Sequence, residues 1–178
     1  MSQSLKQSAP TMSAAYRALS FEDKIVARAD LAQRTQLLAR PVVLTNGVFD
    51  IIHRGHVTYL SRARALGASL VVAVNSDASV RCLGKGADRP INTQADRAAI
   101  VASLECVDLV TVFDEAVPLP VLEIVRPEIY VKGGDYDIDS TPEARLAKTW
   151  GARAVAIAFE HERSTTELLE RVRTAQRD

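Results

Sequence analysis

The chain has 178 residues, of which 47% are hydrophobic and 25% charged, and its 22 basic side chains balance its 22 acidic ones. This length favours a single domain whose core needs no disulfide or metal to fold, and the zero net charge argues against broad nucleic-acid binding. The sequence has no apolar run of the roughly 20 residues that span a bilayer and no signal-peptide core, so we expect a cytoplasmic protein without membrane or nucleic-acid partners.

The chain begins with a segment that carries little structural signal. Residues 1–20 are rich in Ser, Ala and Gln and lack periodicity, which predicts a flexible N-terminal tail. Residues 21–40 show a weak helical pattern, which Pro41 ends. The sequence shows no internal repeat and no sign of a second domain, so we expect residues 21–178 to form one domain.

Short apolar runs then alternate with helical patterns. The runs are continuous rather than alternating, which is typical of parallel strands that are buried on both faces. We expect strands at residues 42–44, 70–74, 109–113, 129–131 and 154–158. Strand and helix alternate five times, which predicts an α/β fold with a Rossmann-like, doubly wound parallel sheet of about five strands.

Helix start signals lie between these runs. Thr93 followed by Asp96, and Ser164 followed by Glu167, have the spacing of capping pairs, and Pro142 is suited to the first turn of a helix. In a doubly wound sheet, ligands bind beyond the carboxyl ends of the strands. We therefore expect the functional residues in four loops, at residues 45–56, 75–92, 132–141 and 159–166.

Two glycines and two histidines stand where the first strand gives way to the first long helix. In the stretch VLTNGVFDIIHRGH, Gly47 follows the strand and Gly55 starts the helix, and glycine permits a close approach of ligand to backbone. A helix N-terminus exposes unpaired N–H groups and partial positive charge, so it can hold phosphate. His53 lies just before the helix and His56 in its first turn, so both can point into one crevice.

Three interpretations of His53 and His56 stay open from the residues alone. They can cap the helix or bond to nearby backbone. They can bind zinc as His-x-x-His, although the sequence offers no third ligand at a suitable spacing. Each imidazole can also donate a hydrogen bond to a phosphate oxygen. The absence of G-x-G-x-x-G argues against a dehydrogenase, and the absence of G-x-x-x-x-G-K-[ST] argues against a P-loop NTPase.

Two motifs on predicted strand–helix turns resemble those of a known superfamily. His53-Arg54-Gly55-His56 resembles the HxGH signature of the nucleotidyltransferases, and Ser164-Thr165-Thr166 resembles their late Ser/Thr motif. Within that superfamily, the chain resembles the adenylyltransferases of the ADP-heptose pathway through TNGVFDIIHRGH, VAVNSDASV, VKGGDYD, STTELLERV and residues 89–97. The resemblance covers about residues 24–174. It implies a single nucleotidyltransferase domain in the stand-alone form, because no sugar-kinase domain precedes it.

The resemblance implies adenylyl transfer from ATP to D-glycero-β-D-manno-heptose 1-phosphate, giving ADP-heptose and pyrophosphate for the inner core of lipopolysaccharide. The small-molecule partners would be ATP and a sugar 1-phosphate, with Mg2+ carried on the ATP and no protein-bound metal, and a homo-oligomer is expected. The nucleophile is a phosphate oxygen that is already anionic near neutral pH, so no general base is required. Positioning and charge neutralisation would supply the catalysis.

The resemblance also assigns roles to individual residues. His53 and His56 would donate hydrogen bonds to the α- and β-phosphates, and Lys85 would fold over the triphosphate; these three are the expected catalytic residues. Asp50 is expected to anchor the first turn structurally. The expected nucleotide- and phosphate-binding residues are Thr45, Asn46, Gly47, Phe49, Asn75, Arg89, Arg97, Lys132, Gly134, Asp135, Ser164, Thr165 and Thr166. Arg89 and Arg97 would each clamp phosphate through two hydrogen bonds; the alternative for Arg97 is a surface position on its helix.

Two departures from the family pattern leave room for rival functions. Leu169 stands where many relatives carry a basic residue, and Phe159 stands where glycerol-phosphate cytidylyltransferases carry an arginine, for which Arg163 is a possible substitute. One rival is a cytidylyltransferase that acts on glycerol 3-phosphate or a similar small phosphate ester. The other is a non-catalytic nucleotide-binding module. Nothing physical in the sequence distinguishes ATP from CTP.

Overall fold

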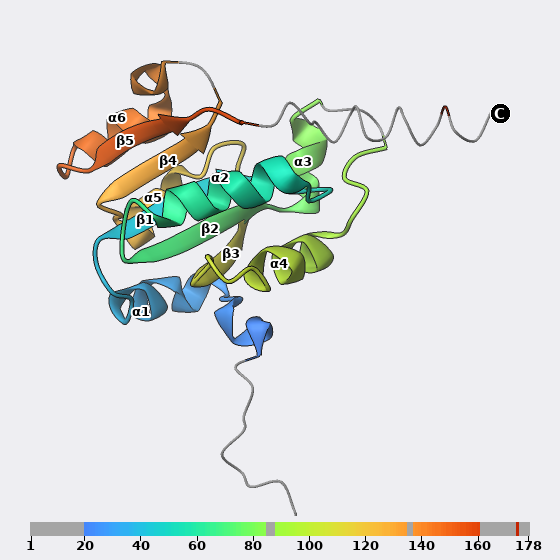
Figure 1. The fold of residues 1–178 in the computed structure, drawn as a ribbon, viewed down its shortest axis with the longest axis horizontal. Helices are drawn as coiled ribbons and strands as arrows, with labels where there is room; N and C mark the ends of the chain where they lie inside the picture. Colours follow the sequence, from blue (N-terminus) through green and yellow to red (C-terminus); the bar gives the residue numbers. More distant parts are fainter. Residues whose placement is uncertain (1–19, 85–87, 135–136, 161–173, 175–178) are drawn as a thin grey trace, which may run out of the picture.

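A five-stranded parallel sheet forms the centre of the protein, in a computed structural model that describes residues 20–84, 88–134, 137–160 and 174. The strands lie in the order β3-β2-β1-β4-β5 (Figure 1). Their bounds are β1 Val42–Gly47, β2 Ser69–Asn75, β3 Leu109–Phe113, β4 Ile129–Gly133 and β5 Arg153–Ile157. The predicted α/β fold with five parallel strands is confirmed.

The strand order reverses direction between β1 and β4. From β1 the chain proceeds to β2 and β3 toward one edge of the sheet, and β4 and β5 then fill the other side. Thr45 of β1 pairs with Val72 on one side and with Val131 on the other. A crevice for ligands is expected beyond the carboxyl ends of the strands at such a switch point. The site should therefore lie where β1 and β4 end.

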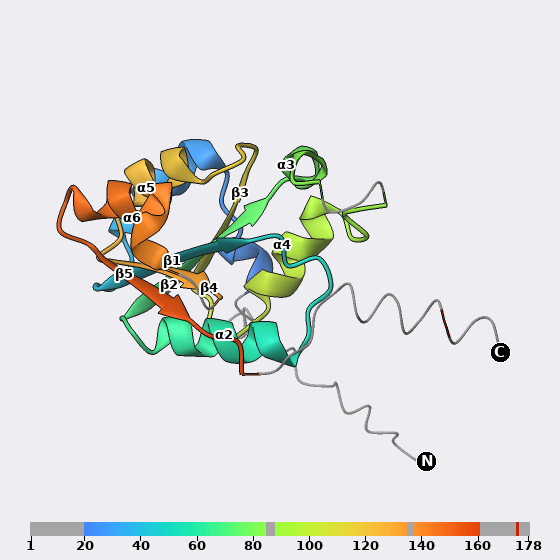
Figure 2. The same cartoon turned by 90° about the horizontal axis from the view of Figure 1, so that it is seen from above.

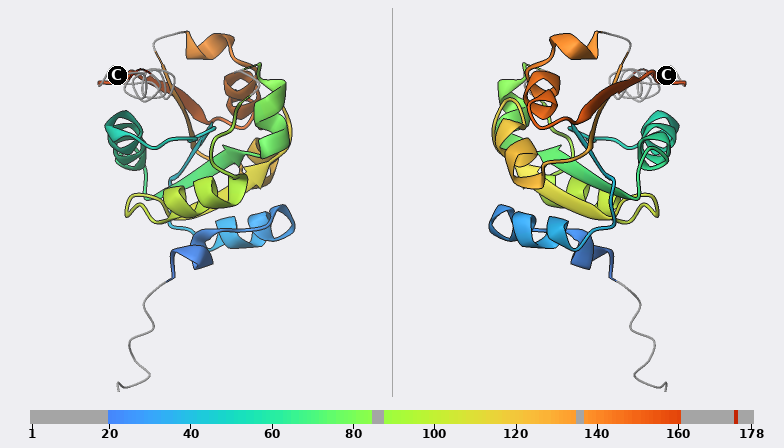
Figure 3. Two further views of the ribbon diagram at one scale, coloured as in Figure 1. Left: turned by 90° about the vertical axis from the view of Figure 1, so that its right-hand side faces the viewer. Right: turned by 90° about the vertical axis from the view of Figure 1, so that its left-hand side faces the viewer.

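Helices cover both faces of this sheet (Figure 2). Their bounds are α1 Leu31–Gln36, α2 Arg54–Arg64, α3 Asp77–Cys82, α4 Gln94–Ala102, α5 Leu119–Val125 and α6 Pro142–Lys148, with 3₁₀ turns η1 Phe21–Lys24, η2 Arg28–Asp30 and η3 Ile138–Ser140. The segment with η1 and η2, drawn blue in Figure 3, follows the β3 edge, where Ile25 forms an isolated bridge with Val110. No helix among the described residues is both long and apolar enough to span a membrane.

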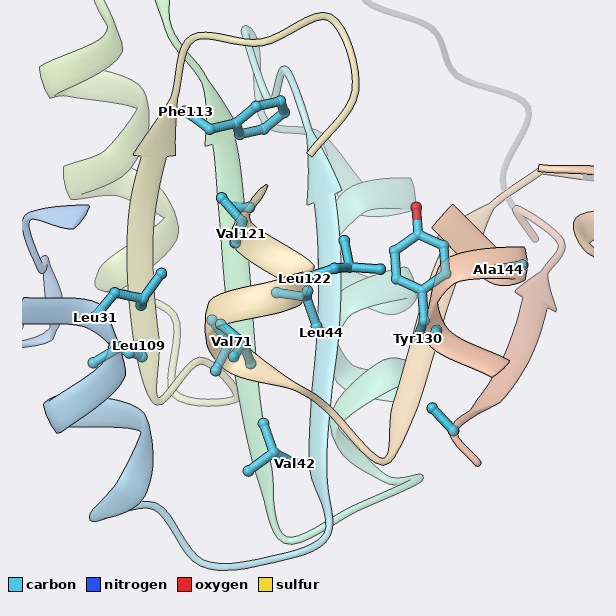
Figure 4. Packing of buried hydrophobic residues seen from close by; sticks show 14 of the residues in the cluster. Leu31, Val42, Leu44, Val71, Leu109, Phe113, Val121, Leu122, Tyr130 and Ala144 are labelled. Carbon is cyan, nitrogen blue, oxygen red and sulfur yellow. The ribbon is translucent and has the colours of Figure 1, made fainter. Parts of the chain in front are cut away.

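Successive side chains along each strand point to opposite faces of the sheet, and this produces two hydrophobic cores. In β2, Val71 and Ala73 face the cluster under α1, α5 and α6, whereas Leu70 and Val72 face the cluster under α2 and α4. Figure 4 shows part of the first cluster, in which Leu44, Val71 and Leu122 meet between the sheet and α5. Each fully buried aliphatic side chain contributes about 1.5–3 kcal/mol, so the two cores fix the strand ends on which the site stands.

The helix start signals hold where the structure describes them. Thr93 accepts a hydrogen bond from the Asp96 N–H (3.2 Å), and Thr141 accepts one from the Ala144 N–H (3.2 Å). The helix predicted to begin at Ser164 lies outside the described residues.

The prediction of one continuous loop over residues 75–92 is wrong. Residues 77–82 form α3, capped by Ser76, which accepts a hydrogen bond from the Ser79 N–H at 3.1 Å. A six-residue helix is too short to produce a recognisable apolar period. It depends instead on this local cap and on packing against the sheet.

A carboxylate at the opposite end of the sheet gives stability that depends on pH. Glu128 accepts a hydrogen bond from the Val42 N–H at 2.7 Å and pairs with Arg40 at 2.5 Å. Burial raises the pKa of Glu128, but these two partners outweigh burial, so the pKa lies below its ordinary value. A lowered pKa means that the native state favours the ionised form. The stabilisation is therefore present above the pKa of the unfolded chain and is lost as the pH falls.

We expect Glu128→Gln to lower the free energy of unfolding at pH 7 by at most about 1 kcal/mol, because solvent screens a pair whose carboxyl side chain is 41% exposed. The difference between wild type and variant should shrink as the pH falls below the ordinary glutamate value of 4.5. Urea unfolding of both proteins at pH 7 and pH 4 measures this difference. A gap of the same size at both pH values would contradict the assigned role.

Candidate active site

The turn from β1 to α2 has a strained but supported backbone. Phe49 adopts φ 50°, a left-handed conformation that costs a residue other than glycine about 1–3 kcal/mol. The Arg97 guanidinium donates to the carbonyl oxygen of Val48 at 2.6 Å, which holds the turn in this shape. A Cβ atom on Gly47 would come within 3.0 Å of the Phe49 ring. Gly47 therefore lets the ring fold back over the end of β1.

The two histidines meet at the start of α2. His53 is the N-cap residue with an extended backbone, and no side-chain bond caps the helix there. The two imidazole rings stack with their centroids 3.9 Å apart and an interplanar angle of 24°, and the Phe49 ring meets His56 edge-on at 5.4 Å. Both histidines are half-buried. The structure thus brings two imidazoles and the positive end of a helix to the carboxyl edge of the sheet.

An aromatic wall lines one side of the histidines. Phe159, two residues beyond β5, lies 5.4 Å from the Tyr59 ring and 6.5 Å from the His56 ring. A Cβ atom on Gly133 would lie 2.4 Å from this phenyl ring, so any other residue at position 133 would displace Phe159 from its present place. The Thr45 hydroxyl is fully buried and lies 2.5 Å from the Tyr59 hydroxyl. The side chain of Thr45 therefore supports the floor of the site from within.

A polar chain crosses the switch point between β1 and β4. The Tyr130 hydroxyl donates to Asn46 Oδ1 at 2.8 Å and lies 3.3 Å from Glu143 Oε1. Lys132 Nζ donates to the same Glu143 oxygen at 2.7 Å. Asn46 and Lys132 were predicted from the sequence, but Glu143 was missed. Its only sequence signal is an acidic residue in the first turn of a helix, which is ordinary helix chemistry.

The segment from Arg89 to Asn92 is tied to the first turn by Asp50. The Asp50 carboxylate, which is 2% exposed, accepts hydrogen bonds from the backbone N–H groups of Ile91 (2.9 Å) and Asn92 (2.9 Å). Arg89 Nε lies 2.6 Å from Asp50 Oδ2. The structural anchor expected at Asp50 is present. Arg89, predicted to clamp phosphate, is paired with this carboxylate and is 9% exposed.

Arg97, for which a phosphate clamp was predicted, is occupied by bonds within the protein. Its side chain is fully buried, and its nitrogens donate to the Asn92 carbonyl (3.1 Å), the Val48 carbonyl (2.6 Å) and Asp77 Oδ1 (2.8 Å). A direct contact with phosphate would require these bonds to be exchanged. The phosphate clamp at Arg97 stays a prediction, and the bonds that the structure shows hold the turn after β1.

The other predicted residues divide into two groups. Asn75, at the end of β2, is 4% exposed and donates from Nδ2 to the Ser79 hydroxyl at 2.9 Å. The Gly134 N–H donates to the Ile157 carbonyl at 3.0 Å, which closes the turn after β4. The remaining predicted residues lie outside the described part of the chain: Lys85, Asp135, Ser164, Thr165 and Thr166.

Within the described residues, neither a metal cluster nor the surface hollow beside α2 competes with this site. Across the described ranges, no group of three or more His, Cys, Asp or Glu residues is arranged to hold a metal ion. A surface hollow of about 440 Å³ lies beside α2 and is lined by Val57, Ser61, Arg64, Leu104, Glu105 and Cys106. None of the predicted site residues lines it. Among the described residues, the histidines and polar side chains of the candidate site therefore lie at the carboxyl ends of β1 and β4.

Comparisons with known proteins agree with this geometry. The profile of the cytidylyltransferase-like family matches residues 44–174. A D-beta-D-heptose 1-phosphate adenylyltransferase from Bordetella bronchiseptica is 60% identical over 155 residues, which are 86% of this chain and 96% of that protein. The bifunctional protein HldE of Geotalea uraniireducens is 46% identical over 80% of this chain. The match spans only 29% of that longer protein.

Solved structures show the same fold. The lipopolysaccharide core biosynthesis protein from Thermoplasma volcanium is 30% identical, with a TM-score of 0.57, and the match covers 68% of this chain and 98% of that one. The pantoate-beta-alanine ligase from Francisella tularensis is 12% identical, with a TM-score of 0.54 over 80% of this chain and 68% of that one, and is alike in fold alone.

Proposed function

The chain belongs to the cytidylyltransferase-like family, and from this premise we propose that it transfers the adenylyl group of ATP to D-glycero-β-D-manno-heptose 1-phosphate. The products are ADP-heptose and pyrophosphate. The observation that carries the proposal is the 60% identity to a heptose 1-phosphate adenylyltransferase over 96% of that protein's length. The stacked histidines at the start of α2 provide the chemistry such a reaction needs.

The reaction is a displacement at the α-phosphorus of ATP. An anionic oxygen of the sugar phosphate attacks, a new P–O bond forms, and the bond between the α-phosphorus and the bridging oxygen breaks, releasing pyrophosphate. Because the nucleophile is already ionised near pH 7, no residue has to remove a proton. The protein has to bring two anions together and stabilise the negative charge that builds up on the phosphates.

The described residues can do this from the two sides of the switch point. His53 and His56 donate hydrogen bonds to the phosphate oxygens at the positive end of α2. Lys132 and Asn46 donate from the ends of β4 and β1. Arg97 and Asp50 keep the turn between these groups in place. Mg2+ enters as part of the substrate, bound to the triphosphate of ATP.

Lys85, Asp135 and the Ser164–Thr166 motif keep their predicted roles in this proposal. Lys85 neutralises charge on the triphosphate, Asp135 bonds a hydroxyl, and the late motif binds the leaving phosphates. We further propose that the reaction takes place in the cytoplasm, where ATP is available, and that the protein works as a homo-oligomer. Size-exclusion chromatography with light scattering tests the oligomeric state.

A pyrophosphate-release assay tests the proposed function. We expect turnover when ATP and heptose 1-phosphate are supplied together with Mg2+, and little turnover when CTP replaces ATP or glycerol 3-phosphate replaces the sugar phosphate. Turnover with CTP and glycerol 3-phosphate alone would show the rival cytidylyltransferase instead. ATP binding without release of pyrophosphate from any of the four substrate pairs would indicate a non-catalytic module.

A further inference from the structure

Glu143 is a buried carboxylate with an incomplete set of partners. Its side chain is 2% exposed and lies in the first turn of α6, beside Ala144 and Ala147 of the core. One oxygen, Oε1, accepts a hydrogen bond from Lys132 Nζ at 2.7 Å and a weaker one from the Tyr130 hydroxyl at 3.3 Å. The other oxygen, Oε2, is buried and has no hydrogen-bond partner within the described residues. A buried charge that is only half satisfied is costly.

This cost argues that Glu143 does not serve stability. Replacing a buried ion pair with apolar residues of similar volume is often neutral or stabilising, and α6 already packs its alanines into the core. Nor can Glu143 contact a substrate in this conformation, because its Oε2 is inaccessible and its Oε1 is occupied. Any effect on the reaction must pass through the groups that it binds.

The first of these groups is the ammonium of Lys132. The Lys132 side chain is 30% exposed and stands at the end of β4, beside the switch point. A lysine has three N–H donors on a flexible four-carbon stem and loses about 2 kcal/mol of rotamer entropy when it is fixed. Glu143 takes one donor at 2.7 Å and fixes the stem, which leaves two donors for phosphate. The ordering of Lys132 is thus complete before substrate arrives.

The second group is the side-chain amide of Asn46, which Glu143 reaches through Tyr130. The Tyr130 ring is fully buried, and Figure 4 shows its hydroxyl at the end of the ring that points toward the carboxyl ends of the strands. The hydroxyl has one proton, which its two acceptors share: Asn46 Oδ1 at 2.8 Å is the nearer acceptor and Glu143 Oε1 at 3.3 Å the weaker one. The bond to Asn46 turns the amide so that its Nδ2 donors remain for other acceptors. One hydroxyl therefore connects the donors on β1 to the carboxylate under β4.

We propose that Glu143 is a positioning residue, which presents Lys132 and, through Tyr130, Asn46 as paired donors to the phosphates of the nucleotide. The inference rests on the proposed function, because that function is what gives Lys132 and Asn46 a nucleotide to bind. It adds a residue that no sequence motif contains. Glu143 belongs to α6, and it joins this helix to both strands that flank the switch point.

The test compares three variants in the full-length chain. Glu143→Gln keeps the shape and removes the charge, Tyr130→Phe keeps the buried ring and removes the hydroxyl, and Lys132→Met removes the ammonium. Asp139→Asn is the matched control, because Asp139 pairs with Lys148 on the surface near the same helix, with side chains that are 60% and 47% exposed. For each protein we measure kcat, the KM of both substrates and the melting temperature.

We expect Glu143→Gln to raise the KM of ATP about tenfold or more, the size of one lost charge-assisted hydrogen bond, with a smaller change in the KM of the sugar phosphate. Tyr130→Phe should shift the KM of ATP in the same direction by less. Adding Glu143→Gln to Lys132→Met should lower kcat/KM for ATP by much less than Glu143→Gln does in wild type, because only the smaller part that passes through Tyr130 is left to lose. Asp139→Asn should match wild type.

Wild-type KM values in Glu143→Gln and Tyr130→Phe, with only a lower melting temperature, would show a structural role and overturn the inference. Fully additive effects of Glu143→Gln and Lys132→Met would also overturn it. If Glu143→Gln did not fold, the KM of ATP in Tyr130→Phe would decide.

If wild type released no pyrophosphate, the proposed function would fail by itself. Titration of ATP by calorimetry would then decide the inference, since equal dissociation constants for wild type and Glu143→Gln would refute it.

Discussion

Replacing His56 with alanine is expected to lower kcat by about a hundredfold to a thousandfold, the effect of removing one donor to charge that develops in the transition state. The imidazole lies in the first turn of α2, stacked on His53 at 3.9 Å and held edge-on by Phe49. It is thus fixed before the reaction begins. Because the bond strengthens as charge builds up on the phosphates, the KM of ATP should change much less than kcat.

Steady-state pyrophosphate release with saturating ATP and heptose 1-phosphate measures the change in kcat. Ser61→Ala is a suitable control, because Ser61 lies five residues further along α2, is exposed and borders the remote hollow. It should behave as wild type. The double variant His53→Ala/His56→Ala should lose less than the product of the two single effects, since the two rings are in contact and hold each other in place. Wild-type kcat in His56→Ala would remove the proposed role of the imidazole.

The sequence predicted those parts of the fold that depend on local patterns. Continuous apolar runs identified all five strands, because parallel strands buried on both faces leave no polar positions. The ends of β1 and β4 were predicted too short, since Thr45–Gly47 and Lys132–Gly133 are not apolar but still continue the strands. These extra residues lie at the candidate site. A functional strand end breaks the hydrophobic pattern for the same reason that it can bind a polar ligand.

The proximity of the two histidines could be predicted from the sequence, whereas the contacts of Arg97 could not. The HxGH motif carries both histidines within four residues, so their proximity follows from one helical turn. The partners of Arg97 are instead spread along the chain, since Val48 lies 49 residues away and Asp77 lies 20 away. Only the packed fold shows that these acceptors surround the guanidinium. Glu143 was missed for the same reason, since α6 has to pack before its carboxylate meets Lys132.

The bonds of Arg97 reach residues that are far apart in the sequence, and their loss should be costly. Arg97→Met is expected to lower the free energy of unfolding by about 3 kcal/mol or more. The substitution leaves the carbonyl oxygens of Val48 and Asn92 and the carboxylate of Asp77 without their donor. The side chain of Asp77 is 25% exposed, so water can replace part of the loss there, but the guanidinium site itself is fully buried. Urea unfolding measures the change.

The same variant should also lose activity, because the bond to Val48 holds the turn in which Phe49 has a positive φ. If that turn relaxes, the Phe49 ring no longer fixes His56, and kcat should fall at temperatures where the variant is still folded. Arg97→Lys should restore only a part of the lost stability and activity, since a single ammonium cannot reach three acceptors in different directions.

Arg28→Gln is the matched control, because Arg28 pairs with Glu115 at the surface with a side chain that is 38% exposed. Its loss should cost less than about 1 kcal/mol. Equal losses of stability in Arg97→Met and Arg28→Gln would mean that burial of the guanidinium adds nothing. Unchanged kcat in a folded Arg97→Met would mean that the turn keeps its shape without this residue.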